Sequence, residues 1–325
     1  MKKLVVVSIF LALVVIVLGA YARLTDAGLG CPDWPGCYGH LSFSKTTENI
    51  EIAQQAFPDR PFEKHKAWNE MIHRYFASGL GFMILVIFVT SLFKKAGNTP
   101  VKLPFFLLCL VCFQGALGMW TVTLNLLPVV VMGHLLGGFT LLSALFLLYL
   151  KLSSYRIPGG DHRVKEFRKF TILGIVIVTV QIALGGWTSA NYAALACTEL
   201  PICEQGWLQR LDFSGAFSIP DVENYEYGAH DYNERMTMHI LHRVGALITF
   251  IYLCWLGMRL FALASSKLIK RLSAIMVLVL GAQVILGVSN VVFSLPVVIA
   301  VMHNAMAACL LLSLVAIAYT LYRKI

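Results

Sequence analysis

The chain has 325 residues, of which 58% are hydrophobic and 13% are charged, and its mean hydropathy is +0.75. Soluble domains carry about a quarter charged residues, so this composition excludes a water-soluble globular protein. The net charge of +9 is compatible with a nucleic-acid partner or with basic cytoplasmic loops, and the positions of the basic residues decide between the two.

Apolar stretches of about 20 residues, enough to cross a hydrocarbon core, recur along the whole chain. Hydropathy predicts eight membrane-spanning helices, at residues 4–22, 71–93, 103–124, 129–150, 170–190, 237–258, 272–293 and 297–322. The first of them also resembles a signal peptide that ends in Ala20-Tyr21-Ala22. Its apolar run is long for a signal, and the internal repeat described below gives it a partner, so we expect a retained span in an all-α polytopic membrane protein.

Basic residues are divided unequally between the two sides of the predicted membrane. With the N-terminus in the cytoplasm, 17 Lys and Arg fall in inner segments and 7 in outer segments, while Arg74 and Arg243 lie inside helices. Of the 17 carboxylates, only Asp161 and Glu166 are on the inner side. The positive-inside rule therefore predicts that both termini are cytoplasmic, as expected in a bacterial inner membrane. The acidic outer face leaves no basic surface for nucleic acid.

The chain is similar to itself at an offset of 166 to 169 residues. The features that repeat are paired as Cys31 and Cys37 with Cys197 and Cys203, His73-Arg74 with His242-Arg243, Gln114 with Gln283, His134 with His303, and Leu18-Gly19 with Leu184-Gly185. Four spans in each unit predict two tandem four-helix bundles related by a pseudo-two-fold axis along the membrane normal. We expect an N-terminal half at residues 1–150, a basic cytoplasmic linker at 151–169 and a C-terminal half at 170–325.

A Leu-Gly pair recurs near the outer end of each odd-numbered span, with the glycines at Gly19, Gly118, Gly185 and Gly287. Small residues allow close approach of helices in a membrane, so we interpret these glycines as packing residues.

Five of the nine histidines lie in predicted helices. His40, His65, His162 and His230 fall in loops and are interpreted as surface residues. A lone intramembrane histidine is most simply a hydrogen-bonded packing residue, but the duplicated set of His73, His134, His242 and His303 lies at similar depth near the outer leaflet. Buried imidazoles in a membrane are functional candidates.

Two neutral imidazoles from facing helices can supply both axial ligands of a haem iron. The alternatives are a zinc site, which needs three or four compact ligands, and a proton relay. The duplication favours two haem sites. Arg74 and Arg243, which follow the ligands, are candidates either for binding haem propionates or for snorkelling to headgroups.

The two halves differ one turn before the first histidine, where Glu70 of the first half corresponds to His239 of the second. Glu70 shares a helix face with His73 and is a candidate base at a porphyrin edge, or else an interfacial carboxylate paired with Lys66 or Arg74. The four outer cysteines Cys31, Cys37, Cys197 and Cys203 form two C-x5-C pairs. They are interpreted first as disulfides that stiffen outer loops and second as a redox-active dithiol, whereas Cys109, Cys112, Cys254 and Cys309 lie within spans and are interpreted as packing residues.

These features together resemble the haem A synthase family over essentially the whole chain. The residues that carry the resemblance are Glu70-Met71-Ile72-His73-Arg74, Leu127-Pro128 with His134, Ile240-Leu241-His242-Arg243, Leu295-Pro296 with His303, and the outer cysteine pairs. The resemblance implies a membrane enzyme that oxidises the C8 methyl of haem O to a formyl group, giving haem A for terminal oxidases. It also implies haem b (iron protoporphyrin IX) as a cofactor on His242 and His303, with Arg243 beside it, and substrate haem O near His73, His134, Arg74 and Glu70.

On this hypothesis water supplies the oxygen, Glu70 helps it add, and electrons leave through the bound haem b. His239 stays open as an alternative ligand. Haem O synthase and oxidase assembly factors are candidate partners, while the electron acceptor and the oligomeric state, including a homo-oligomer, are left open. The alternative functions are a di-haem b-type cytochrome that oxidises quinol without modifying haem and, last, a transporter, for which the broken helices expected at the membrane midplane are missing from the sequence pattern.

Overall fold

The computed structural model describes residues 1–41, 55–58, 60–93, 100–157 and 160–323. Four of the basic residues used for the orientation, Lys45, Lys94, Lys95 and Lys324, lie outside these ranges. Within the described ranges the chain forms helices and turns and no strand. The long helices are α1 (Lys2–Leu24), α3 (Lys64–Phe93), α4 (Lys102–Thr123), α5 (Pro128–Lys151), α6 (Arg168–Ala190), α8 (Tyr232–Leu263), α9 (Lys267–Val292) and α10 (Val297–Arg323).

The eight long helices are all apolar enough to cross a membrane, which confirms the predicted all-helical, polytopic fold. Two of them begin earlier than hydropathy predicts. Helix α3 begins at Lys64, and α8 begins at Tyr232 behind a capping box in which Asp231 and Glu234 satisfy each other's backbone amides. The extra polar turns of α3 place Glu70, which lies just before the predicted span, inside a helix.

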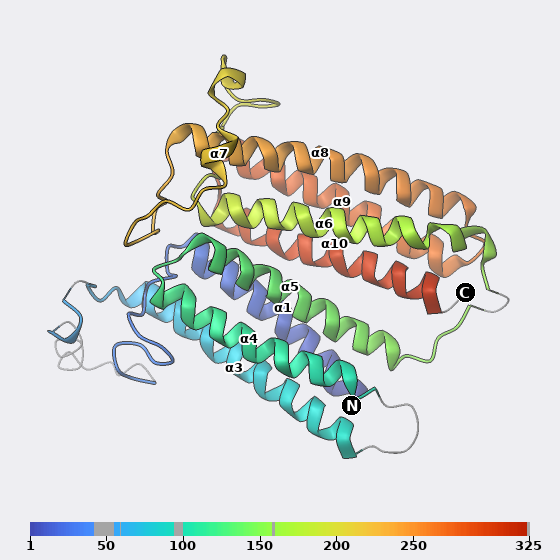
Figure 1. Cartoon of the computed structure of the whole chain (residues 1–325). Coiled ribbons are helices and arrows are strands. Elements are labelled where there is room, and N and C mark those ends of the chain that lie inside the picture. The colour runs from blue at the N-terminus through green and yellow to red at the C-terminus, as the bar shows by residue number, and fades with distance from the viewer. Residues whose placement is uncertain (42–54, 59, 94–99, 158–159, 324–325) are drawn as a thin grey trace.

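The helices form two groups that lie side by side (Figure 1). Helices α1, α3, α4 and α5 contact one another around a closed ring, and α6, α8, α9 and α10 do the same. The groups meet along α1, α5, α6 and α10, where Gly186 of α6 lets Leu135 of α5 approach so closely that a Cβ would lie 2.8 Å from its Cδ2. The pseudo-two-fold axis and the functional division of the halves stay predictions.

Polar contacts join the two groups at one end and hold the linker to the second group at the other. Arg23 at the end of α1 donates to the Ser189 carbonyl of α6 at 2.5 Å and lies 3.9 Å from the ring centroid of Tyr192. At the opposite end of the helices, buried Asp161 of the linker accepts two hydrogen bonds of 2.8 Å, from the backbone amides of Ser265 and Ser266. The linker contains the short helix η1 (His162–Phe167), which is packed against α6, α8 and α10 of the second group.

Candidate functional site

His73 and His134 lie opposite each other within the first group of helices. His73 is on α3 and His134 is on α5, and their ring centroids are 6.4 Å apart with an angle of 82° between the ring planes. One metal atom bonded by a nitrogen of each ring at about 2 Å would hold two imidazole centroids about 6 Å apart. The separation of this pair therefore fits two axial ligands of one iron atom.

The four repeated glycines each face one of the four duplicated histidines. An added Cβ would lie 2.9 Å from Cε1 of His73 at Gly19, 3.5 Å from that of His134 at Gly118, 2.8 Å from that of His242 at Gly185, and 3.1 Å from that of His303 at Gly287. The glycines do allow close packing, but what they pack against is an imidazole ring. The same contact is thus made four times, between α1 and α3, α4 and α5, α6 and α8, and α9 and α10.

We expect Gly185→Ala to displace the His242 ring. Contacts under 3 Å force a shift, and overpacking costs about 1–3 kcal/mol, which corresponds to a roughly 5- to 150-fold loss in affinity for a ligand bound by that ring. The haem-to-protein ratio of the purified variant measures the effect. Gly281→Ala is the matched control, because a Cβ at Gly281 meets open space. Equal haem content in the two variants would show that Gly185 does not position His242.

Several ring nitrogens in the site lack a well-formed hydrogen bond. The Nδ1 atoms of His73, His134 and His303 are buried without one, although each ring interacts with a backbone group, of Val15, Gln114 and Gln283 respectively. Gln181 Nε2 lies 2.9 Å from His242 Nδ1, and Gln283 Nε2 lies 3.2 Å from His303 Nε2. Buried polar atoms are normally satisfied, so imidazole nitrogens without a well-formed hydrogen bond are candidates for binding a ligand.

Nowhere in the described part of the chain do three His, Cys, Asp or Glu side chains gather closely enough to hold a metal ion. A zinc site needs such a group, whereas a haem iron needs only one or two axial ligands from the protein. The donor set therefore fits haem.

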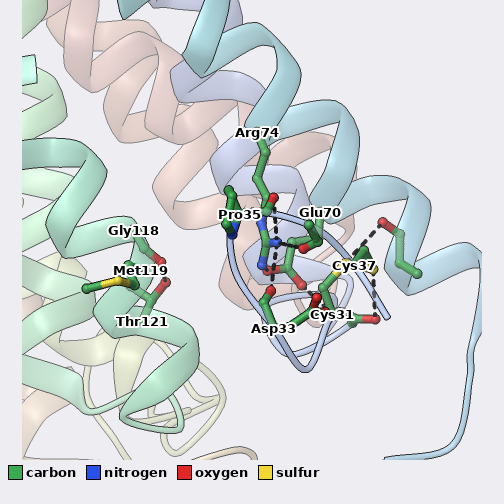
Figure 2. Close-up of polar contacts among 12 residues, drawn as sticks. Cys31, Asp33, Pro35, Cys37, Glu70, Arg74, Gly118, Met119 and Thr121 are labelled. Atoms are coloured by element: carbon green, nitrogen blue, oxygen red, sulfur yellow. Dashed lines mark hydrogen bonds and ion pairs between the residues drawn. A yellow bond between two sulfur atoms is a disulfide. The ribbon is translucent and has the colours of Figure 1, made fainter. Parts of the chain in front are cut away.

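Glu70 is buried and holds the first disulfide loop, residues 31–37, against α3 (Figure 2). Its Oε2 accepts a hydrogen bond of 2.8 Å from the backbone amide of Cys31, and its Oε1 is paired with Arg74 one turn along the helix. Of the two partners considered from the sequence, Arg74 is the one that is observed. Both carboxylate oxygens are therefore fixed on the face of α3 that carries His73.

Arg74 and Arg243 bind the two disulfide loops in the same way. Arg74 donates to the carbonyls of Asp33 at 2.9 Å and Pro35 at 3.4 Å, and also to that of Gly36. Arg243 donates to the carbonyls of Glu199 at 2.7 Å, Pro201 at 3.5 Å and Cys197 at 2.5 Å. Sequence reasoning missed this role, although the His-Arg and Cys-x5-Cys motifs recur together in the repeat, at offsets of 169 and 166 residues, which was a signal for it.

Both predicted disulfides are present, with Cα–Cα distances of 4.8 Å for Cys31–Cys37 and 5.2 Å for Cys197–Cys203. Tyr38, next to Cys37, donates from its hydroxyl to the Arg60 and Pro61 carbonyls, and burial raises the pKa of its phenol. The loop is thus fixed to the segment before α3 as well as to α3 itself.

His239 occupies the position in α8 that Glu70 has in α3. It is buried, and its Nδ1 lacks a well-formed hydrogen bond to the described residues. His242, one turn later, is the ring that faces a repeated glycine, as His73 does. This contact favours His242 as the equivalent of His73.

The surface interpretation holds for three of these four histidines and is wrong for the fourth. His40, His65 and His162 are exposed, although His65 lies in the first turn of α3 and not in a loop. His230 is buried, and its Nδ1 lies 2.7 Å from Glu234 Oε2. That pairing depends on the capping box at the start of α8, which the hydropathy pattern did not predict.

Known proteins match this chain over nearly its whole length. The family model described as "Cytochrome oxidase assembly protein" (COX15-CtaA) matches residues 2–315. The chain is 51% identical to the heme A synthase of Shewanella oneidensis, over 98% of this chain and 96% of that protein. It is 24% identical to the heme A synthase of Rickettsia prowazekii, over 98% and 96%, and 26% identical to that of Rickettsia akari, over 94% and 93%.

Proposed function

The chain belongs to the cytochrome oxidase assembly protein family (COX15-CtaA), and we propose that it is an enzyme that oxidises haem O to haem A. The observation that carries this activity is the 51% identity with a heme A synthase over nearly the full length of both chains. It is a multi-pass membrane protein that acts on haem, and its substrate is haem O.

The proposal assigns substrate haem O to the first half of the chain. His73 and His134 would hold the haem O iron, and their separation of 6.4 Å between ring centroids supports this assignment. The glycines at 19 and 118 leave room for the two rings. Because Arg74 is occupied by the loop carbonyls and by Glu70, its contribution to haem binding is to hold the loop and the carboxylate in place.

The second half is assigned to a resident haem b held by His242 and His303. Gln181, bonded to Nδ1 of His242, orients that ring, and the lack of a well-formed hydrogen bond at Nδ1 of His303 supports a ligand role. Arg243 holds the second disulfide loop beside this site. When bound, haem b supplies one-electron redox chemistry.

Glu70 is proposed as the base that activates water at the C8 methyl of haem O. Addition of water to the methyl carbon gives an alcohol and releases two protons and two electrons, and an electron acceptor outside the chain takes up the electrons. A second such oxidation gives a hydrate that loses water to become the formyl group. Arg74 and the Cys31 amide stabilise the ionised carboxylate, which is the form that accepts a proton.

The proposed cellular location rests on the distribution of Lys and Arg along the chain. We place the chain in a bacterial inner membrane with both termini in the cytoplasm and both haem sites near the outer leaflet, as the excess of inner Lys and Arg supports. Haem O synthase and oxidase assembly factors are the proposed partners, and the chain is a candidate homo-oligomer.

Pigment extraction tests the function. The chain is produced in a host that makes haem O but no haem A, and the extracted haems are separated by chromatography. We expect haem A, together with the hydroxymethyl form, in amounts that depend on the haem O supply. An extract that contains only haem b would instead support the di-haem electron carrier.

A further inference from the structure

The two disulfide loops, residues 31–37 and 197–203, lie beside membrane helices and not beyond their ends. Arg74, which binds the first loop, is ten residues after the start of α3, or about 15 Å along the helix axis. It lies inside the apolar run that begins at residue 71, and Arg243 lies inside the run that begins at residue 237. The loop carbonyls bound to these arginines are therefore at the depth where the spans begin.

The arrangement of the chain agrees with this placement. In Figure 1 the dark blue segment after α1 lies beside the start of α3, and the yellow segment before α7 (Phe213–Ala216) projects sideways past α8. Tyr75, which follows Arg74, donates from its hydroxyl to the carbonyl of Leu41 at 2.8 Å. The chain that leaves the first loop is thus bound to the outward-facing surface of α3.

Each loop exposes a large apolar side chain at a matching position, and in the second loop Thr198 and Glu199 are exposed beside it. Trp34 in the first loop is 42% exposed, and Leu200, at an offset of 166, is 45% exposed. Each lies between the two residues whose carbonyls the arginine binds. The neighbouring helix surfaces are also exposed and apolar, at Tyr75 and Phe76 on α3 and at Val244 and Leu247 on α8. Each loop therefore continues the lipid-facing surface of the helix beside it.

Non-helical backbone at membrane depth is costly unless its polar groups are satisfied. In each loop one guanidinium satisfies three carbonyls, and in the first loop Glu70 also accepts the Cys31 amide. Trp and other apolar side chains beside such a backbone are favourable at the membrane interface. These hydrogen bonds from Arg74 and Arg243 thus make the loop backbone compatible with a lipid environment.

We propose that both disulfide loops insert into the interface of the outer leaflet, with Trp34 and Leu200 in contact with phospholipid. The inserted loops flank α3 and α8 at the depth of the His-Arg pairs. This proposal concerns where the loops lie and does not depend on the haem chemistry.

Photocrosslinking tests the proposal on the full chain in vesicles of phosphatidylethanolamine and phosphatidylglycerol. Benzoyl-phenylalanine is introduced at position 34 or 200 and, as controls, at Lys64 or Asp221, which are exposed outside the loops. We expect several-fold more phospholipid adduct at 34 and 200 than at the controls. Equal adduct at all four positions, or adducts to a second copy of the chain, would overturn the proposal.

A second measurement needs no unnatural residue and covers a labelled variant that fails to fold. The fluorescence of Trp34 is obtained as the difference between the wild-type chain and Trp34→Phe. We expect phospholipids brominated in their acyl chains to quench this difference more strongly than aqueous acrylamide does. Stronger quenching by acrylamide would place Trp34 in water and overturn the insertion.

Discussion

Glu70→Gln is expected to lower haem A formation by about 10²- to 10⁴-fold while haem stays bound, because general-base catalysis contributes a factor of that size. Gln is close to Glu in shape and keeps a carbonyl oxygen that can accept from the Cys31 amide, so the disulfide loop can stay in place. What the substitution removes is the negative charge and the capacity to accept a proton. The product is measured by pigment extraction, and the bound haem by absorbance of the same preparation.

Glu63→Gln is the matched control for this experiment. Glu63 is an exposed carboxylate shortly before α3, and it pairs with Lys66 at 2.9 Å and not with the loop. We expect it to leave haem A formation unchanged. Normal haem A production by Glu70→Gln would remove Glu70 from the mechanism and leave it the purely structural role that its two hydrogen bonds describe.

His242→Ala and His303→Ala are each expected to abolish most of the b-type absorbance of the purified protein. Each removes one of the two proposed axial ligands of the resident haem and leaves a cavity in place of the ring. His239→Ala is the control, because His239 is also buried in α8 but does not face a repeated glycine. We expect this variant to keep the b-type spectrum.

The three variants together identify the ligand on α8. Loss of the spectrum in His239→Ala, with retention in His242→Ala, would assign the ligand role to His239. An unchanged spectrum in both His242→Ala and His303→Ala would refute the haem b assignment to the second half.

The spans and the disulfides could be predicted because their signals are local. An apolar run of sufficient length needs a helix in a membrane, and two cysteines six residues apart around Pro35 can meet within one loop. The internal repeat gave independent support for the site, because it duplicates His73 and His134 as His242 and His303 and so distinguishes these four histidines from the other five.

The contacts that could not be predicted join distant segments. The hydrogen bonds from Arg74 and Arg243 to the loop carbonyls form only because each disulfide loop folds back beside its helix. Hydropathy does not predict how a loop folds. The Gln181–His242 contact uses a side chain that the first half lacks, because the aligned residue there is Val15, which interacts with His73 through its backbone. The repeat therefore gave no signal for the glutamine contact. The burial of His230 follows from its pairing with Glu234, which depends on where α8 begins.

The two histidine pairs are proposed to hold different haems, the substrate on the first pair and the cofactor on the second. Haem analysis of a His73→Ala/His134→Ala double variant, isolated from a host that makes haem O, tests it most directly. We expect the extract to contain haem b in wild-type amount and neither haem O nor haem A. Haem O or haem A at the wild-type level, or loss of haem b alone, would contradict the assignment.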